Sequence, residues 1–468
     1  MKRSLVWVGL VGGLWAQAYE YANGWIQAGA PYLKLRVARE GVYRVYASQV
    51  GLSGVPSSSL RLFWRGQEVP LYVQDGGDGS FEGSDWFEFW GQRNDGEPDS
   101  VVYRHPHQLR RFAGLHGNPK MPLNQNDTSA YFLTWGGAAG LRYLDFSDPN
   151  VLTHPTQDWF WWRYEESFHM GGYWAGPGGL FVGGYEMHNN PMYIAGEGRG
   201  AGVNPLSRTY TLPSPKGGVS PGFFVELSHA GLSISGSFTL EWKVNGFSAS
   251  VATITAPYYF RPRFSVPASY LTNPLTVQVT ASGSGYGGEF LHYVAITYPR
   301  EGVLGAGDTV LQAGVVNPTG GPWALVLAGV PIDAGDSLLV YDPRHRLRWK
   351  AVANGGLWYV PIPAIQDSFP LYVVRGASVR GPLVEPAVIE NYSGAAGAEI
   401  LLVTHRSLTA SAQAYKQYRE THPTQSPFGV HRLHRCDLRR VWLGTGESSP
   451  GHSESGSVGF GIVLGCQA

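Results

Sequence analysis

Short apolar segments that alternate with polar residues make up most of this chain, and glycine or proline separates them. Tyr32–Val37 alternates apolar and basic residues, which is the pattern of a strand with one face toward solvent. A turn at Glu40-Gly41 leads to Val42–Tyr46, so the two segments predict a β-hairpin. Asn245-Gly246, a pair that tolerates positive φ, predicts another hairpin turn after the strand at 238–244. The chain is expected to be mainly β.

The same pattern predicts three β domains in tandem. We expect an N-terminal β domain at 19–148, a β-sandwich or jelly-roll-like domain at 155–300, and a small β domain at 301–385. Further strands are predicted at 59–64, 68–73, 85–90, 130–135, 159–164, 223–227, 275–279, 292–298, 337–341, 347–350, 357–360 and 371–374.

The pattern changes near residue 398. Glu399–Val403 predicts a buried parallel strand, and Leu408–Glu420 predicts the helix that follows it, which together open an α/β domain. Such a domain needs further βα units to cover its sheet, but residues 431–468 show neither periodicity. We therefore expect an incomplete α/β unit at 398–430 with an unpaired strand, followed by a tail without regular structure.

Composition limits the classes of binding partner, and the N-terminal residues indicate where the protein is located. Lys plus Arg and Asp plus Glu number 35 each, which favours neither nucleic acid nor an acidic surface as a partner. Lys2 and Arg3, the apolar stretch Leu5–Trp15 and Ala16-Gln17-Ala18 predict a signal peptide at 1–18. The protein is thus expected to be exported, to the periplasm, the outer-membrane surface or the medium. The apolar stretch is too short to predict a membrane span.

One acidic segment is a weak candidate for calcium binding. Asp75, Asp78, Glu82 and Asp85 lie close together in sequence, and clustered carboxylate oxygens are preferred calcium ligands. The spacing departs from an EF-hand, because Gly77 stands two positions after Asp75. A solvated turn built from Asp and Gly explains the same residues. No cofactor is assigned from the sequence, and calcium stays possible at this segment.

Histidine and cysteine give two weaker metal hypotheses. His431, His434 and Cys436 are zinc-ligand types, but a structural site needs a fourth ligand and a folded frame. The remaining candidates, His452 and Cys466, lie in sequence without periodicity, so we interpret this spacing as accidental.

A second possible metal set lies around the glycine-rich stretch at 171–202. His169, Glu186 and His188 could meet there around a metal ion. Because glycine-rich sequence fixes no spacing, surface polar residues are the simpler interpretation.

Tryptophans give an alternative, non-catalytic function. Trp159, Trp161, Trp162 and Trp174 could stack sugars on a sandwich face, as in an adhesin or a carbohydrate-binding module. Aromatic residues of all-β proteins are more often part of the core. An extracellular β-sandwich binding protein therefore stays the alternative.

The order of several segments resembles gingipain-like cysteine peptidases, in particular the large sortase of the type IX secretion system. The similarity covers residues 30 to about 430. It is carried by Tyr32–Val45, Leu60–Gly66, Asp78–Phe81 with Phe89–Gly91, Gln92–Gly96, Thr128–Trp135, His292–Arg300 and Glu399–His405. The resemblance implies a caspase/gingipain-like α/β peptidase domain after the β domains, and protein substrates or secretion-system components as partners.

In that family a Cys nucleophile paired with a His hydrolyses or transfers an acyl group. The resemblance places both residues beyond about position 430, and neither Cys436 nor Cys466 occupies a family position. No catalytic residue is therefore assigned. We expect an exported scaffold or prodomain portion of such a peptidase or sortase, without activity of its own.

A shift of the reading frame would explain the tail. After the helix the family continues with a stretch like Ile-Tyr-Asp-Glu-Phe-Gly-Trp-Gly. Codons allowed for Asp437–Gly446, read one base later, are compatible with that stretch. The hypothesis is that the frame slips near Gly429, and the DNA sequence of the locus around codon 430 tests it.

Overall fold

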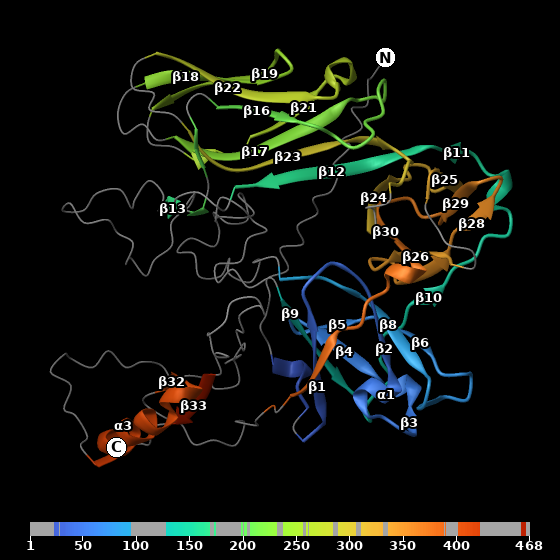
Figure 1. Cartoon of the computed structure of the whole chain (residues 1–468), viewed down its shortest axis with the longest axis vertical. Coiled ribbons are helices and arrows are strands. Elements are labelled where there is room, and N and C mark those ends of the chain that lie inside the picture. The colour runs from blue at the N-terminus through green and yellow to red at the C-terminus, as the bar shows by residue number, and fades with distance from the viewer. Residues whose placement is uncertain are drawn as a thin grey trace.

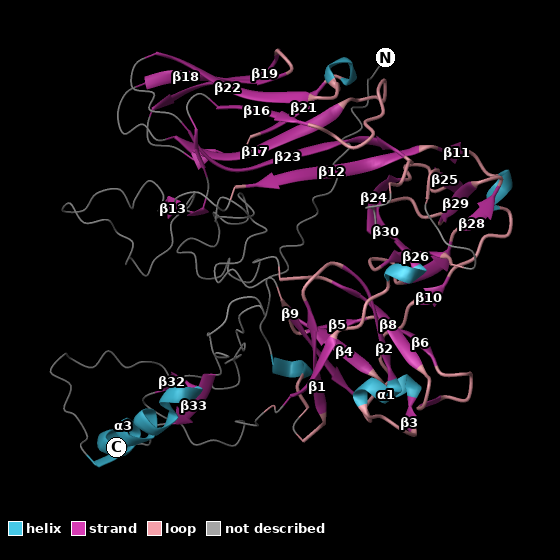
Figure 2. Cartoon of the chain, viewed as in Figure 1, coloured by secondary structure: helices cyan, strands magenta, loops and turns pink. Residues whose placement is uncertain are grey.

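The computed structural model describes residues 23–27, 29–94, 128–168, 173–174, 198–199, 201–203, 206–231, 237–255, 259–260, 262–283, 289–305, 310–330, 336–387, 389, 401–421 and 460–464. The described chain is mainly β, as the sequence predicts, and β-strands account for most of its regular structure (Figure 2). Its short 3-10 helices lie at Asn23–Trp25, Ser57–Ser59, Val151–Thr153, Ala268–Tyr270, Gly376–Ser378 and Arg406–Leu408.

The N-terminal unit, residues 29–94 and 128–143, packs two sheets against each other (Figure 1, blue). One sheet has the order β31-β1-β9-β4-β5 and the other β2-β8-β6. The elements are β1 (Tyr32–Val37), β2 (Gly41–Tyr46), α1 (Ala47–Val50), β3 (Val55–Pro56), β4 (Arg61–Trp64), β5 (Gln67–Val69), β6 (Tyr72–Gln74), β7 (Ser80–Phe81), β8 (Trp86–Gly91), β9 (Ser129–Thr134) and β31 (Leu383–Ala387).

The predicted hairpin of 32–37 with 42–46 is wrong. Strand β1 pairs with β9 and β31, whereas β2 pairs with β8 in the other sheet. Leu35 and Val37 of β1 share one buried core with Tyr43 and Val45 of β2. The chain therefore crosses from one layer to the other near Gly41, and the two strands face a common core from opposite sheets.

The sandwich, residues 159–301, consists of two layers (Figure 1, upper part). One layer is a four-stranded sheet of order β16-β22-β18-β19, and the other contains strands β12, β23 and β17. The predicted turn at Asn245-Gly246 is confirmed, since it joins β18 to β19 with φ of 48° and 81°. The strands are β12 (Trp159–Ser167), β13 (Tyr173–Trp174), β14 (Gly198–Arg199), β15 (Ala201–Val203), β16 (Leu206–Tyr210), β17 (Phe223–Gly231), β18 (Ser237–Val244), β19 (Phe247–Thr255), β20 (Tyr259–Phe260), β21 (Arg263–Val266), β22 (Leu275–Gly283) and β23 (Glu289–Glu301).

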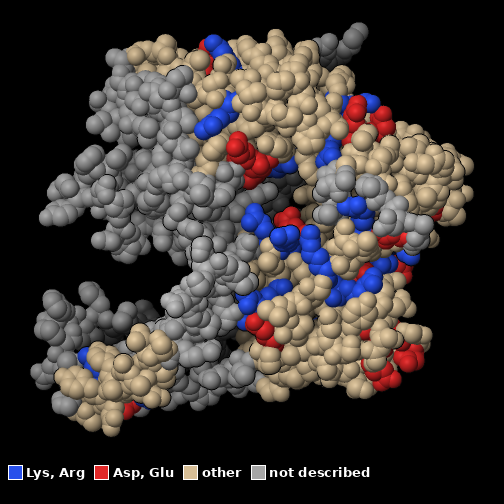
Figure 3. Space-filling model, viewed as in Figure 1, with Lys and Arg blue, Asp and Glu red and all other residues tan. Residues whose placement is uncertain are grey.

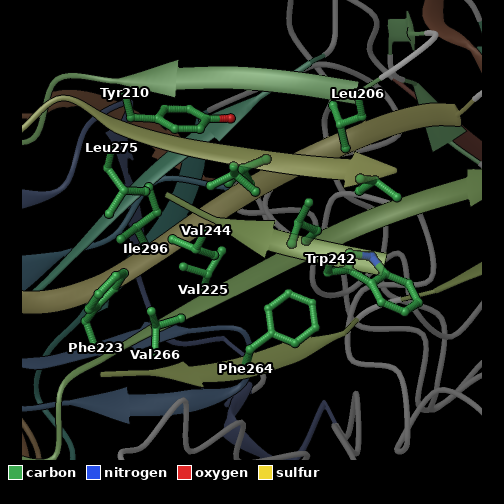
Figure 4. Packing of buried hydrophobic residues seen from close by; sticks show 14 of the residues in the cluster. Leu206, Tyr210, Phe223, Val225, Trp242, Val244, Phe264, Val266, Leu275 and Ile296 are labelled. Atoms are coloured by element: carbon green, nitrogen blue, oxygen red, sulfur yellow. The ribbon is translucent and has the colours of Figure 1, made fainter. Parts of the chain in front are cut away.

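Alternation along these strands builds the sandwich core, which Figure 4 shows from close by. In β18 buried positions alternate strictly with more accessible ones, and Trp242 and Val244 point inward. Val225 of β17 and Ile296 of β23 meet them from the opposite sheet. Burial of such apolar surface is the main source of stability in a β-sandwich.

The third unit, residues 310–375, continues the same large sheet. Its order runs β10-β27-β26-β30-β24-β12-β23-β17-β20, so one sheet crosses the boundary predicted at 300. The elements are β10 (Leu144–Asp145), β11 (Thr156–Gln157), β24 (Val310–Val316), β25 (Trp323–Leu327), β26 (Leu338–Asp342), β27 (Leu347–Lys350), β28 (Val352–Asn354), β29 (Leu357–Ile362) and β30 (Ser368–Arg375).

The aromatic strand β12 meets β24 at one close approach in this sheet. Trp161 of β12 pairs with Gly314 of β24. A Cβ atom added to Gly314 would lie 2.9 Å from the Trp161 Cβ and 3.1 Å from its carbonyl oxygen. Glycine is required here because the backbones of the sandwich and the third unit leave no room for a side chain.

The C-terminal part differs from the expectation in two ways. The predicted helix is confirmed as α3 (Thr409–Thr421). The strand before it, β32 (Leu401–His405), is antiparallel and paired rather than parallel and unpaired. Its partner is β33 (Phe460–Leu464), which lies in the tail that was expected to lack regular structure. Strand β33 is the apolar run Phe-Gly-Ile-Val-Leu. Such a run shows neither the helical period nor the polar–apolar alternation by which the other strands were predicted.

Candidate functional site

Three of the four acidic residues proposed for calcium each complete a turn of their own, and the carboxylate of the fourth, Glu82, accepts the Ser80 hydroxyl at 3.3 Å. The Asp75 carboxylate accepts the Gly77 amide at 3.0 Å, that of Asp78 accepts Ser80 N at 2.9 Å, and that of Asp85 accepts Glu82 N at 2.8 Å. Hydrogen bonds from the Ser57 hydroxyl and the Gly77 amide hold the pKa of Asp75 below its usual value. These contacts are those of a solvated β-turn.

No metal-binding group forms among the residues that the structure describes: no three His, Cys, Asp or Glu side chains lie close enough together to hold a metal ion. The other metal candidates from the sequence lie outside the described residues, as does the predicted signal peptide. These candidates are His169, Glu186, His188, His431, His434, Cys436, His452 and Cys466.

The tryptophans of β12 are packing residues. Trp161 is buried and contacts Trp159 edge-on, with ring centroids 5.8 Å apart. Trp162 is half-buried beneath the Arg300 guanidinium, which lies 4.7 Å from its ring centroid. Trp174 lies in β13, separate from this strand. The side chains of β12 therefore form a core and cation–π contacts, and they offer no open row of rings for a sugar.

The strongest polar constellation in the described residues lies where the N-terminal unit meets the third unit. In β8 the side chains alternate between two faces. Phe87 and Phe89 enter the core of the N-terminal unit, while Glu88 and Trp90 face the third unit. The alternation at 85–90 predicts this strand, but nothing in the local sequence shows that the carboxylate of Glu88 is buried.

Two rows of side chains face each other across the junction. In the N-terminal unit Arg44 and Tyr72 stand directly opposite Glu88 on the neighbouring strands β2 and β6. In the third unit Arg348 and Tyr372 stand opposite Tyr341, on β27 and β30. We call these six residues the junction cluster. Their rows come from two different sheets, so the cluster exists only when the units are in contact.

Glu88 is the centre of the junction cluster and is fully buried. Its Oε1 accepts two bonds from Arg44, from Nη2 at 2.6 Å and from Nε at 3.0 Å. Its Oε2 accepts Arg348 Nη2 at 3.1 Å and the Tyr341 hydroxyl. Each carboxylate oxygen therefore has charged donors, as a buried carboxylate requires.

The third-unit side of the cluster is equally complete. Arg348 Nε donates to the Tyr341 hydroxyl oxygen at 2.9 Å, and the guanidinium lies 3.7 Å from the Tyr72 ring centroid. Burial, followed by the Glu88 charge, raises the pKa of Tyr341 well above 10.0. Tyr341 therefore remains a neutral hydroxyl that donates to Glu88 and accepts from Arg348.

Apolar packing surrounds the charged centre and keeps water out. Trp90 of the N-terminal unit stacks on Tyr372 of the third unit, with ring centroids 3.8 Å apart. Val42 and Leu339 are buried in the same cluster of apolar side chains. Low water access strengthens each ionic hydrogen bond and also makes the loss of any partner costly.

The segment 376–387 ties the two units together a second time. Arg380 pairs with β2: its carbonyl accepts Arg44 N at 2.7 Å and its amide donates to Val42 O at 3.0 Å. The chain then forms β31 along β1, where Glu385 binds Lys34 at 2.7 Å and Arg36 at 3.3 Å. The last strand of the β region is thereby paired with its first strand.

The residues of the junction cluster bind one another and hold the two units together. Both oxygens of Glu88 are engaged by donors within the protein, so none is directed at a substrate or a water. Neighbouring Asp342 is likewise buried and accepts His345 Nδ1 at 2.6 Å and the His345 amide at 3.1 Å. Burial raises the pKa of Asp342 above its usual value. The arrangement holds two units in one register.

Comparisons with known proteins find similarity only to parts of solved structures, at low sequence identity. No family model matches the sequence, and no curated protein matches it. Among solved structures, 84% of this chain aligns with 36% of dimeric latent PorU from Porphyromonas gingivalis, at 12% identity and a TM-score of 0.49. A xanthan lyase from Paenibacillus aligns over 71% of this chain and 31% of its own, at 10% identity and a TM-score of 0.15. The chain spans about a third of the length of each.

Neutralising Glu88 is expected to destabilise the protein strongly. Glu88→Gln replaces a fully buried carboxylate by an amide beside the buried Arg348 guanidinium and the half-buried Arg44, and breaking a buried ion pair costs about 3–5 kcal/mol. The control is Glu385→Gln, because Glu385 pairs with Lys34 at a partly exposed edge where the loss is about 0–1 kcal/mol. Denaturant unfolding gives both free energies. Equal losses for the two variants would contradict the role of Glu88.

Stability is expected to fall above pH 10. Burial raises the folded-state pKa of Tyr143, Tyr341 and Tyr372 above 10.0, whereas in the unfolded chain these residues ionise near pH 10. Their contribution is fully present below pH 10 and is lost as the pH rises toward the folded-state values.

Tyrosinate absorbance and denaturant unfolding, followed together through this pH range, test the expectation. A subset of the 26 tyrosines should ionise only as the protein unfolds. Ionisation of all of them near pH 10 in a protein that stays folded would be the opposite result.

Proposed function

We propose that residues 30–387 form the rigid β scaffold of an exported, gingipain-like cysteine peptidase or type IX secretion sortase, and that this chain has no peptidase activity. The observation that carries the proposal is the closure of the β region on itself: β31 pairs with β1 just before the chain enters β32 and α3. A scaffold that positions a following domain must hold the chain in a fixed place where it leaves the β region.

Two further features support the scaffold role. The junction cluster engages its buried charges internally and leaves Glu88 no coordination open to a ligand. The large sheet joins the third unit to the sandwich through the pairing of Trp161 with Gly314. Together with the order of family-like segments in the sequence, these features favour mechanical support over chemistry.

The absence of activity rests on the resemblance. In the family the acyl group passes to a Cys thiolate activated by a His, and neither Cys436 nor Cys466 occupies the corresponding position. Partners of the scaffold would be protein substrates or components of the secretion system. Export and the signal peptide at 1–18 belong to the same proposal.

Peptide hydrolysis tests the proposal. The purified chain is incubated with a panel of fluorogenic peptides under reducing conditions, with and without a thiol-alkylating reagent. We expect no thiol-dependent turnover from the wild type, nor from Cys436→Ser and Cys466→Ser as matched controls for contaminating activity. Turnover that alkylation or either substitution abolishes would overturn the proposal.

A further inference from the structure

The five-stranded sheet of the N-terminal unit carries aromatic side chains on the face that points away from its core. Leu62 and Trp64 of β4 contact the core of the unit, so Phe63 between them lies on the outer face. Phe132 of β9 is the direct cross-strand partner of Phe63 on that face. Phe63 is only 3% exposed although it points outward. Another segment of the chain must therefore cover this face.

Residues 23–27, which we call the N-terminal strap, provide that cover. The Trp25 indole stacks on Phe63 with ring centroids 5.2 Å apart, and it lies 5.3 Å from the Phe132 ring. Tyr32 of β1 stands edge-on to the indole at 5.8 Å. Strands β1, β9 and β4 are neighbours in the sheet. The indole therefore occupies a pocket made of three rings from three adjacent strands.

The pocket also binds the backbone beside the indole. The Tyr32 hydroxyl accepts a hydrogen bond from the Gln27 amide at 2.8 Å and donates one to the Trp25 carbonyl at 3.4 Å. One side chain thus contacts both ends of the segment from Trp25 to Gln27. An apolar pocket combined with a few polar groups that fix the orientation of the ligand is typical of a binding site.

The sheet and an ion pair build the walls of this pocket. The three strands pair in regular register, which fixes where each ring stands. The Arg61 guanidinium lies 4.8 Å from the Phe63 ring centroid. Glu68 holds that guanidinium with hydrogen bonds of 2.8 and 3.1 Å. None of these contacts involves the strap, so the pocket is preformed.

The strap itself is held by few contacts. It contains a single 3-10 turn at Asn23–Trp25, Trp25 and Ile26 are half-buried, and Gln27 is exposed. Ordering such a segment costs conformational entropy, which opposes the gain from burying one indole. Segments with few buried contacts open at low free energy while the rest of a protein stays folded. We therefore expect the strap to leave the pocket without unfolding the sheet.

Charge contributes little to recognition at this surface. Lys34 and Arg36 both pair with Glu385 on the same face of the sheet, at 2.7 and 3.3 Å. Figure 3 shows small groups of basic and acidic side chains within a mostly uncharged surface in the lower part of the molecule. An uncharged aromatic side chain is therefore the ligand that the pocket suits.

We propose that Tyr32, Phe63 and Phe132 form a preformed peptide-binding pocket for a tryptophan side chain, and that the N-terminal strap occupies this pocket reversibly. Trp25 is then a ligand tethered within the chain, and its departure exposes the pocket. The pocket and the junction cluster lie on different sheets of the N-terminal unit. The inference is independent of the proposed scaffold role, so either can fail without the other.

A peptide added in trans tests the pocket. A fluorescein-labelled peptide of residues 23–30 is titrated into the full chain carrying Trp25→Ala, and fluorescence anisotropy gives the Kd. We expect saturable binding to this variant and at least about tenfold weaker binding to the wild type, because the tethered strap competes at a high effective concentration. The same peptide with alanine in place of its tryptophan should not bind.

A second substitution locates the binding site. Phe132→Ala, added to Trp25→Ala, removes one wall of the pocket and should abolish binding. The matched control is Phe224→Ala in the same background, because Phe224 is also half-buried but lies on β17 of the sandwich. The control should bind the peptide as Trp25→Ala alone does. A folded Trp25→Ala protein that binds no peptide, equal binding to the wild type, or binding that Phe132→Ala leaves unchanged would each overturn the proposal.

Hydrogen exchange of the wild type tests the detachment of the strap without any substitution. The Gln27 amide, which donates to Tyr32, should exchange through a local opening at a free energy well below that of the β1 and β9 amides. Equal free energies for Gln27 and for these strands would mean that the strap leaves only when the sheet unfolds, and the proposal of reversible occupation would then be wrong.

Discussion

A buried carboxylate must be matched by positive charge, and in this protein the match comes from two different sheets. Glu88 has no solvent exposure, and Arg44 of its own unit supplies one of its two cationic partners. The other, Arg348, comes from the third unit together with the Tyr341 hydroxyl. Separation of the units would leave the carboxylate with half its donors or expose the aromatic side chains around it. The contact between the N-terminal unit and the third unit is thus the constraint on which the arrangement of the β region depends.

Two further backbone connections hold the third unit in place, one to the N-terminal unit and one to the sandwich. Segment 376–387 leaves the third unit, pairs with β2 at Arg380, and adds β31 to the first strand of the protein. On the other side Gly314 allows the third unit to share a sheet with the sandwich. Pairings between residues more than 300 positions apart hold the N-terminal unit in place, so the β region behaves as one body from which β32 and α3 follow.

Much of the secondary structure could be predicted from alternation, but the pairing could not. The segments at 85–90, 337–341 and 347–350 were predicted as strands, and the structure has β8, β26 and β27 there. Period-two alternation says which residues share a face and not which sheet that face meets. For this reason the hairpin predicted for β1 and β2 was wrong, and the partner of β32 in the tail was missed.

The candidate site was harder to predict because its residues are distant in sequence. The local signals were carboxylates and histidines close together. The histidine candidates lie outside the described residues, and in the structure Asp75 and Asp78 each accept a backbone amide in a surface turn. A lone glutamate between tryptophans in Trp-Phe-Glu-Phe-Trp was the available signal for Glu88. An acidic residue at an apolar position in an aromatic strand needs a buried cation, but only the fold identifies it as Arg348.

The central claim is that the N-terminal unit and the third unit cannot open separately. Native-state hydrogen exchange, followed by mass spectrometry at increasing denaturant concentration, measures the opening free energy of each strand directly. Amides of β2 and β8 should exchange with the same free energy and the same denaturant dependence as those of β26 and β30. Exchange of β2 and β8 at a distinctly lower free energy, while β26 and β30 remain protected, would contradict the account.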